Sequence, residues 1–293
     1  MNKQKTFAVV GGDLRQVHVA NRLSGEGYQV YGMLLETNMA LDESVRCTND
    51  ISGILPKCDV VILPMPVTTD DVNINAPFTS YKVRVEDCIK HLNKKSSVFG
   101  GKINQRTKDL AEKTGIELVD YLEREELAVL NGVITAEGAL AIAMEELPIS
   151  IFQSRCVVVG HGRIAKVLAR YLKAMGAQVT VAARKYSDLA WISAENCKAV
   201  HIRQLSAVVR EADVLFNTVP AHILNREVLS HLKTDALVID LASKPGGVDL
   251  DDASELGVKT IWALSLPGKV APITAGEIVL STIFNCLDEK GEL

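Results

Sequence analysis

The sequence predicts an α/β protein with two Rossmann-like, doubly wound parallel-sheet domains and a cleft between them. Three observations predict this fold: the length of 293 residues, short apolar runs that alternate with helical patterns, and one glycine-rich strand-to-helix turn. A chain of this length suits two domains of about 100–200 residues each. We expect a first domain over 1–132, a connecting helix over 133–149 and a second domain over 150–268, with 270–293 packing back on the first.

Composition and charge narrow the class of protein. Apolar residues make up 47% and charged residues 23%, which is close to the average of globular domains. A net charge of −4 without a block of Lys or Arg predicts no nucleic-acid partner and no binding to an anionic membrane surface. We find no signal-peptide core and no apolar stretch of membrane-spanning length, so we expect a cytoplasmic protein. The six cysteines lie far apart without a Cys-x-x-Cys pair, which predicts reduced thiols and no metal site.

The second half shows the strand and helix rhythm of a complete Rossmann domain. Each expected strand is a short apolar run bounded by Gly, Pro or polar residues. The strands are expected at Cys156–Val159, Gln178–Ala182, Lys198–Ile202, Val214–Asn217, Ala236–Leu241 and Thr260–Ala263.

The first half repeats this rhythm less clearly and predicts a degenerate domain of the same kind. Between the halves, Thr135–Glu146 is rich in strong helix formers. Near the end, Ala275–Leu287 has an apolar face at helical spacing. Strands of the first half are expected at Thr6–Val10, Tyr28–Met33, Val60–Leu63, Ser97–Phe99 and Glu117–Val119.

The chemistry of the second half starts at a Gly-x-Gly-x-x-Ala turn that follows an apolar strand. Gly160 permits the tight turn, Gly162 lets the backbone approach a pyrophosphate, and the small Ala165 lets helix pack on strand. The diphosphate of a nicotinamide dinucleotide would then lie on the helix N-terminus. The expected cofactor-binding residues of this turn are Gly160, His161, Gly162, Arg163 and Ile164.

The residues that close the second strand of this half favour NADP over NAD. NAD enzymes favour Asp or Glu there, which bonds the ribose 2′-hydroxyl. This chain has Arg184 and Lys185 instead, and a guanidinium can bind a 2′-phosphate bidentately. The alternative is that Arg184 is an ordinary solvated loop residue.

Two later loops should border the nicotinamide half of the cofactor, because ligands of this fold bind at the carboxyl ends of the strands. Thr218, Val219 and Pro220 follow the fourth strand, and Leu241 and Ala242 follow the fifth. Ordinary turn chemistry also explains the Pro and Gly residues of these loops.

The first half has its own strand-to-helix turn, Gly11-Gly12-Asp13, but its spacing is not that of a dinucleotide-binding motif. We interpret it as a substrate-side element in which Arg15 binds a carboxylate. An equally good alternative is a helix N-cap by Asp13 with Arg15 exposed.

Several longer segments together resemble the A-subunit family of dipicolinate synthases, the stage V sporulation proteins of spore-forming bacteria, over essentially the whole chain. They are much more specific than the Rossmann turn alone. The matching segments are Gly11-Gly12-Asp13-x-Arg15-Gln16, Thr135-x-Glu137-Gly138, Gly160-x-Gly162-Arg163, Asp240-Leu241-Ala242-Ser243-Lys244-Pro245-Gly246-Gly247 and Leu266-Pro267-Gly268-Lys269-Val270-Ala271-Pro272-x-Thr274-Ala275-Gly276.

The resemblance implies oxidation of a dihydrodipicolinate-type intermediate to pyridine-2,6-dicarboxylate, with NADP as oxidant, in the mother cell of a sporulating bacterium. It also implies a second, flavoprotein-like subunit, and we expect self-association as well. The fold looks similar to that of alanine and 2-hydroxyacid dehydrogenases. His161, inside the glycine turn, is interpreted as a tolerated variable position.

The implied substrate has two carboxylates, which cannot be buried without partners. We expect Arg15, Lys244 and Lys269 to supply positive charge, with the hydroxyls of Thr135 and Ser243 as neutral donors. Removing a hydride and a proton makes the ring aromatic, so the reaction needs orientation more than acid–base power. Glu137 is the candidate base and Lys244 the second catalytic candidate. A capping-box glutamate at a helix start is the alternative for Glu137.

Two other functions stay open. One is a non-catalytic, NADP-binding scaffold that activates its partner subunit. The other is a 2-hydroxyacid or alanine dehydrogenase-like enzyme, although 263–275 lacks the His that 2-hydroxyacid dehydrogenases use.

Overall fold

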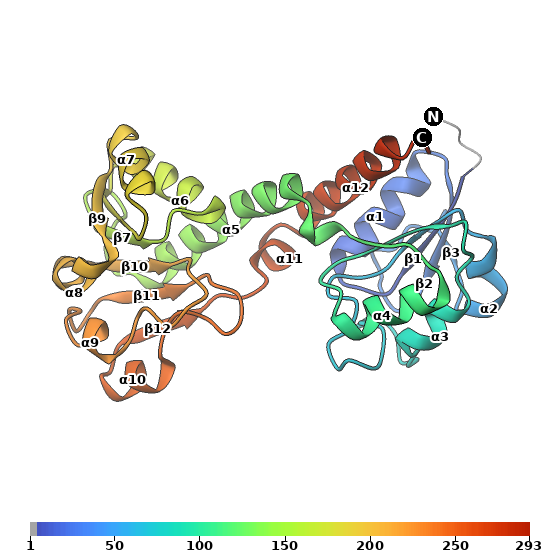
Figure 1. The fold of residues 1–293 in the computed structure, drawn as a ribbon, viewed down its shortest axis with the longest axis horizontal. Coiled ribbons are helices and arrows are strands. Elements are labelled where there is room, and N and C mark those ends of the chain that lie inside the picture. Colours follow the sequence, from blue (N-terminus) through green and yellow to red (C-terminus); the bar gives the residue numbers. More distant parts are fainter. Residues whose placement is uncertain (1–4) are drawn as a thin grey trace. The chain divides into compact units, whose positions relative to one another are not determined.

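The computed structural model describes residues 5–293, which form two compact units. The first unit holds the residues up to Leu130 together with Ala271–Leu293, and the second holds Asn131–Val270. Each unit is built on its own six-stranded parallel sheet with helices on both faces (Figure 1). The prediction of two doubly wound parallel-sheet domains is therefore confirmed.

The sheet of the first unit comprises β1 (Thr6–Val10), β2 (Gln29–Met33), β3 (Arg46–Cys47), β4 (Val60–Ile62), β5 (Ser97–Gly100) and β6 (Leu118–Asp120). Their order is β3-β2-β1-β4-β5-β6, and every neighbouring pair is parallel. Strand β3 was not expected from the sequence, because this exposed edge strand has two residues and no apolar run. Although its sequence pattern is weak, the first unit has the complete six-strand topology.

Alternation along β1 builds the two cores of the first unit. Phe7 and Val9 pack with α1 and the C-terminal helix α12, whereas Ala8 and Val10 pack on the other face with α3 and α4. Gly276 of α12 lies so close to α1 that an added Cβ would be 2.9 Å from the Arg15 carbonyl oxygen. The helices are α1 (Leu14–Gly25), α2 (Ile51–Ile54), α3 (Val85–Lys90), α4 (Gln105–Thr114) and α12 (Pro272–Glu289), with 3-10 turns η1 (Leu55–Lys57) and η2 (Tyr121–Glu123).

The sheet of the second unit comprises β7 (Arg155–Val159), β8 (Gln178–Ala183), β9 (Lys198–His201), β10 (Val214–Asn217), β11 (Leu237–Asp240) and β12 (Lys259–Trp262). Its order, β12-β11-β10-β7-β8-β9, is the Rossmann order when it is counted from β7. Cys156 and Val158 face α5 and α6, and Val157 and Val159 face α8, α9 and α10. The remaining elements are α6 (Arg163–Ala174), α7 (Tyr186–Ala194), α8 (Leu205–Val208), α9 (Arg226–Leu229), α10 (Leu250–Glu255), α11 (Leu266–Val270), η3 (Ile202–Gln204) and η4 (Val209–Glu211).

Helix α5 (Glu125–Glu146) begins earlier than the expected connecting helix over 133–149 and ends sooner. By length and composition alone it could span a membrane, contrary to the expectation that no apolar stretch is long enough. It is the only such helix among the residues that the structure describes, and half of its most apolar window is buried inside the protein. Ala136, Ala139 and Ala143 are part of the core of the second unit, which explains the apolar composition.

The six cysteines are free thiols in the structure, and only Cys47 is exposed. Burial raises the pKa of the Cys58 and Cys156 thiols to about 11 and that of Cys88 to about 12. Within residues 5–293, no three His, Cys, Asp or Glu side chains are grouped so that they could hold a metal ion.

Candidate functional site

The glycine turn after β7 has the backbone that a dinucleotide-binding turn requires. Gly160 has a φ of +106°, in the region that favours glycine, and its N–H donates to the Ala182 carbonyl oxygen at 2.8 Å. An added Cβ would lie 2.3 Å from Oγ1 of Thr218. Thr218 Oγ1 in turn donates to the Val159 carbonyl oxygen at 2.8 Å. The turn is therefore held between its neighbouring strands and tolerates only glycine at this position.

The next glycine, Gly162, stands at the N-cap of α6 and forms no side-chain capping bond. An added Cβ at Gly162 would have no heavy atom within 4 Å, so the space beside this backbone is open. The first N–H groups of a helix have no partner within the helix. An open backbone and a helix N-terminus without a cap fit the diphosphate of a nicotinamide dinucleotide. The completely buried Ala165 is small, as the packing of α6 requires.

Beyond the end of β8, Arg184 and Lys185 are both exposed. Lys185 is the N-cap of α7 and provides no side-chain capping bond, and Asp188 is the acidic residue of the first turn. The structure thus places two cations at the strand end that adjoins the adenine-side ribose in this fold. His161 of the glycine turn is unlike its neighbours, because only 2% of its side chain is exposed.

The loops after β10 and β11 are held together by a buried carboxylate that the sequence analysis did not single out. Asp240 is 1% exposed and accepts bonds from the Ala242 N–H at 3.0 Å and the Gly247 N–H at 2.8 Å. Asn217 Nδ2 donates to Asp240 Oδ1 at 2.8 Å. These bonds shape the loop that carries Ser243 and Lys244. The signal in the sequence was an acidic residue that ends an otherwise apolar strand.

The indole of Trp262 fixes the same loop from β12, since Nε1 donates to the Ala242 carbonyl oxygen at 2.9 Å. Leu241 and Ala242 are buried, whereas Ser243 and Lys244 are exposed. In the β10 loop Pro220 is exposed, and Thr218 and Val219 are partly buried. The expected cofactor-side loops thus both lie at the carboxyl edge of the second sheet.

The remaining candidates of the second unit lie on two helices in contact. A Cβ added to Gly138 of α5 would be 3.0 Å from Val270 and 3.2 Å from Leu266, both of α11. Lys269 of α11 and Glu137 of α5 are exposed. Glu137 lies in the middle of α5, so the alternative of a capping-box glutamate at a helix start is wrong.

Thr135 does not provide the neutral donor that was expected of it. Its Oγ1 donates to the Asn131 carbonyl oxygen at 2.7 Å, and the residue is 8% exposed. A hydroxyl has a single proton, so this bond leaves Thr135 only as an acceptor.

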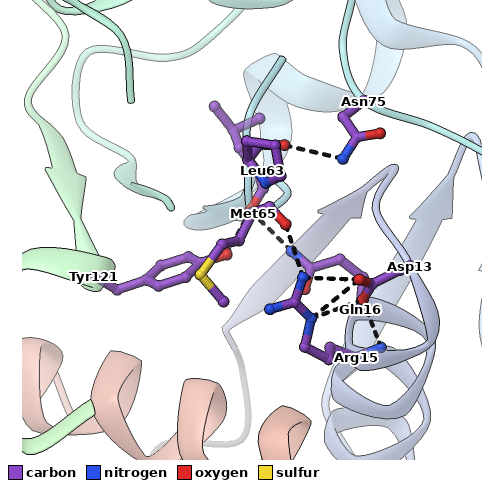
Figure 2. Close-up of polar contacts among 8 residues, drawn as sticks. Asp13, Arg15, Gln16, Leu63, Met65, Asn75 and Tyr121 are labelled. Atoms are coloured by element: carbon purple, nitrogen blue, oxygen red, sulfur yellow. Dashed lines mark hydrogen bonds and ion pairs between the residues drawn. The ribbon is translucent and has the colours of Figure 1, made fainter. Parts of the chain in front are cut away.

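In the first unit, the Arg15 side chain is hydrogen-bonded to other residues of the protein (Figure 2). Its Nε and Nη2 donate to the Asp13 carboxylate at 2.9 and 2.7 Å, and Nη2 also donates to the Met65 carbonyl oxygen at 2.8 Å. Asp13 accepts from the Arg15 backbone N–H as the N-cap of α1. The N-cap alternative was therefore correct about Asp13, but Arg15 is 9% exposed and not a solvated side chain. Its charge is already balanced by Asp13.

The neighbouring side chains close the rest of this turn. Gln16 Nε2 and the Tyr121 hydroxyl both donate to the Leu63 carbonyl oxygen, at 2.9 and 3.2 Å (Figure 2). Burial raises the pKa of Tyr121 above its usual range, so this hydroxyl stays a donor. Gly12 donates its N–H to the Asn75 carbonyl oxygen at 2.7 Å. Nothing in the local sequence pairs 121 or 75 with this turn, so sequence reasoning missed both.

Two family models match the chain, one within each of its two units. Residues 6–122 match the N-terminal domain of dipicolinate synthase A subunits. Residues 135–250 match the NAD-binding domain of D-isomer specific 2-hydroxyacid dehydrogenases.

A full-length relative decides the family. The A subunit of dipicolinate synthase from Bacillus subtilis (strain 168) is 32% identical over 287 residues, which are 97% of this chain and 96% of the relative. The chain belongs to the A-subunit family of dipicolinate synthases. Its fold matches the crystal structures of the A subunits from Bacillus halodurans (30% identity, TM-score 0.90, 97% of each chain) and from Bacillus subtilis (31% identity, TM-score 0.90, 100% of each chain).

Membership of this family and the matched domain establish a dehydrogenase-type role with a nicotinamide dinucleotide as cofactor. The predicted cofactor class and the predicted family are confirmed. The glycine turn and the open N-terminus of α6 are the residues of this chain that would hold it.

Proposed function

We propose that this chain is the oxidoreductase subunit of a dipicolinate synthase and that it oxidises a dihydrodipicolinate-type intermediate to pyridine-2,6-dicarboxylate with NADP. The observation that carries the proposal is a whole-length likeness to a dipicolinate synthase A subunit together with a dinucleotide-binding turn whose helix N-terminus has no side-chain cap. When bound, the cofactor accepts the hydride. The preference for NADP rests on Arg184 and Lys185 at the end of β8.

The two carboxylates of the substrate need cations, and Lys244 and Lys269 are the best suited. Both are exposed, and neither forms an ion pair or a side-chain hydrogen bond within residues 5–293. Their ammonium groups are thus available to a ligand. Ser243 adds a hydroxyl donor beside Lys244. Arg15 is the weaker candidate, because Asp13 and Met65 already use its Nε and Nη2.

The proton balance of the reaction assigns one role to a base. The dihydropyridine ring loses a hydride to the cofactor and a proton to the protein, and the product ring is aromatic. Glu137 is our candidate acceptor of this proton, since it is an exposed carboxylate on the helix that packs against α11. The buried bonds of Asp240 keep the Ser243–Lys244 loop in place and so orient the substrate.

We further propose that this chain pairs with a second, flavoprotein-like subunit, that it also self-associates, and that it works in the cytoplasm of the mother cell. These proposals rest on the family. The other function to be tested is a scaffold that binds NADP and activates the partner, in which case the chemistry would lie elsewhere.

Absorbance at 340 nm tests the proposal with purified chain, substrate and partner subunit, each left out in turn, and with NADP or NAD. We expect reduction of NADP that requires this chain and the substrate. Lys244→Ala should raise KM for the substrate about tenfold or more, the loss of one charge-assisted bond, and leave the Kd for NADP unchanged. Lys233→Ala is the matched control, because Lys233 pairs with Asp213 away from the loops of the site.

Two results would contradict the proposal. Reduction that continues without this chain would assign the chemistry to the partner. Faster reduction of NAD than of NADP at equal concentrations would contradict the preference drawn from Arg184.

A further inference from the structure

The start of α7 carries charges of opposite sign where the 2′-substituent of the adenine ribose binds in this fold. Arg184 and Lys185 precede the helix and attract a phosphate. The first turn has no side-chain cap, so its backbone N–H groups can also bind an anion. Asp188 in the same turn repels that anion, and its side chain is 34% exposed. A 2′-phosphate would bind more tightly here if the charge of Asp188 were balanced.

The group that can balance Asp188 comes from the glycine turn. His161 Nδ1 lies 3.7 Å from Asp188 Oδ1, too far for a hydrogen bond but close enough for a strong charge interaction. The imidazole is 98% buried, and neither ring nitrogen has a hydrogen-bond partner among the described residues. Buried polar atoms without partners are rare because each loses its hydration without compensation, so such a group requires an explanation. The interpretation of His161 as a tolerated variable position does not explain why its ring is buried without a partner.

We propose that His161 is a positioning residue for cofactor choice that acts through Asp188: a proton on its buried ring neutralises this carboxylate and so permits a 2′-phosphate at the start of α7. This inference rests on the proposed use of NADP. The ring is too well covered to touch the cofactor, which is why it acts through Asp188. With a neutral ring, Asp188 keeps its negative charge and favours a ribose 2′-hydroxyl instead.

Two cations stand at the same strand end as Asp188. Arg184 and Lys185 lie between β8 and α7, directly before the helix that carries Asp188. These cations oppose a proton on His161 while the site is empty, and a bound 2′-phosphate neutralises them. Binding of a 2′-phosphate should therefore draw a proton onto His161, whereas a ligand without that phosphate should not.

The test uses two probes that differ only in the 2′-phosphate, adenosine 2′,5′-bisphosphate and adenosine 5′-monophosphate. Each is titrated into the full chain by calorimetry at pH 7.5 and fixed salt, in two buffers of different ionisation enthalpy. His161→Gln should weaken the bisphosphate about tenfold and the monophosphate less than about twofold, given the strength of a charge pair at this distance. Asp188→Asn should bind the bisphosphate at least as well as wild type. In the double variant, the loss caused by His161→Gln should disappear.

Proton uptake separates this role from a merely structural one. Wild type should take up protons with the bisphosphate, whereas His161→Gln and Asp188→Asn should not. The control is His231→Gln. His231 is bonded to the Glu227 carbonyl oxygen and precedes β11, so it lies at the amino ends of the strands, away from the glycine turn. If His161→Gln does not fold, the missing uptake in Asp188→Asn still decides.

Each contrary result is specific. Equal losses with both probes, or a loss that persists beside Asp188→Asn, would overturn the coupling to Asp188. Wild-type discrimination that His161→Gln leaves intact would overturn the inference and leave the NADP proposal standing. A wild type that binds both probes equally would overturn both.

Discussion

The two strand-to-helix turns of this chain occupy the same place in two sheets of the same strand order, yet they differ in what fills them. In the first unit, Asp13 caps α1 and accepts hydrogen bonds from the Arg15 guanidinium. A Cβ added to Gly12 would lie 2.3 Å from Gln16. In the second unit, Gly162 caps α6 without a side chain, and a Cβ there would touch nothing within 4 Å. The first turn is closed by its own side chains, and the second is open to a ligand.

Glycines in such a turn therefore have two separate uses. In the closed turn they let the protein pack against itself, so changing them should lower stability. In the open turn Gly162 keeps space for an external group, so changing it should lower affinity. Substitutions in the two turns should therefore have opposite signatures.

The largest effect is expected for Gly12→Ala in the closed turn. Gly12 has a φ of +88°, and the new methyl group would overlap the buried Gln16 side chain. Strain and overpacking together should cost about 2–4 kcal/mol of unfolding free energy. Urea unfolding measures this loss, with Gly25→Ala at the end of α1 as control, since a Cβ there meets nothing within 4 Å. Equal stability of the two variants would refute the closed turn.

The next effect concerns the ion pair that closes this turn. Arg15→Met removes the guanidinium bonds to the Asp13 carboxylate, which keeps only its bond from the backbone N–H of residue 15, and leaves the Met65 carbonyl oxygen without its donor. This change should cost about 1.5–3 kcal/mol. The unfolding free energy of Arg15→Lys should lie between those of wild type and Arg15→Met, because an ammonium keeps the charge but not the bidentate geometry of a guanidinium. The same variants are titrated with dipicolinate. Unchanged stability together with lost dipicolinate binding would show that Arg15 binds the substrate and does not stabilise the turn.

The smallest effect on stability, and the sharpest contrast, is expected for Gly162→Ala. Its φ suits alanine, and the added Cβ has free space, so the unfolding free energy should change by less than about 1 kcal/mol. The methyl group would stand where the diphosphate approaches, so NADP affinity should fall about tenfold. Fluorescence titration measures this, and Gly12→Ala should show the reverse pattern. NADP binding equal to wild type would mean that the diphosphate does not approach Gly162.

Much of the fold could be predicted because it depends on local patterns. Apolar runs of four to six residues marked β7, β8 and β10, and the glycine turn marked the start of α6. The start of α5 was misplaced because an apolar, Ala-rich helix has no internal boundary signal. The short edge strand β3 was missed for lack of an apolar run.

The strand rhythm, the family motifs, the cofactor class and the residues at each strand end can all be read from local patterns in the chain. Which polar side chains are available to a ligand, and which are already bonded within the protein, depends on the folded structure. Arg15 is committed because Met65, fifty positions away, accepts its hydrogen bond, and Asp240 because Asn217 and Gly247 fold around it. Lys244 has no such partner in the described part of the chain. Whether a charged side chain can bind a ligand depends on neighbours that folding brings from distant parts of the chain, and no local sequence pattern contains them.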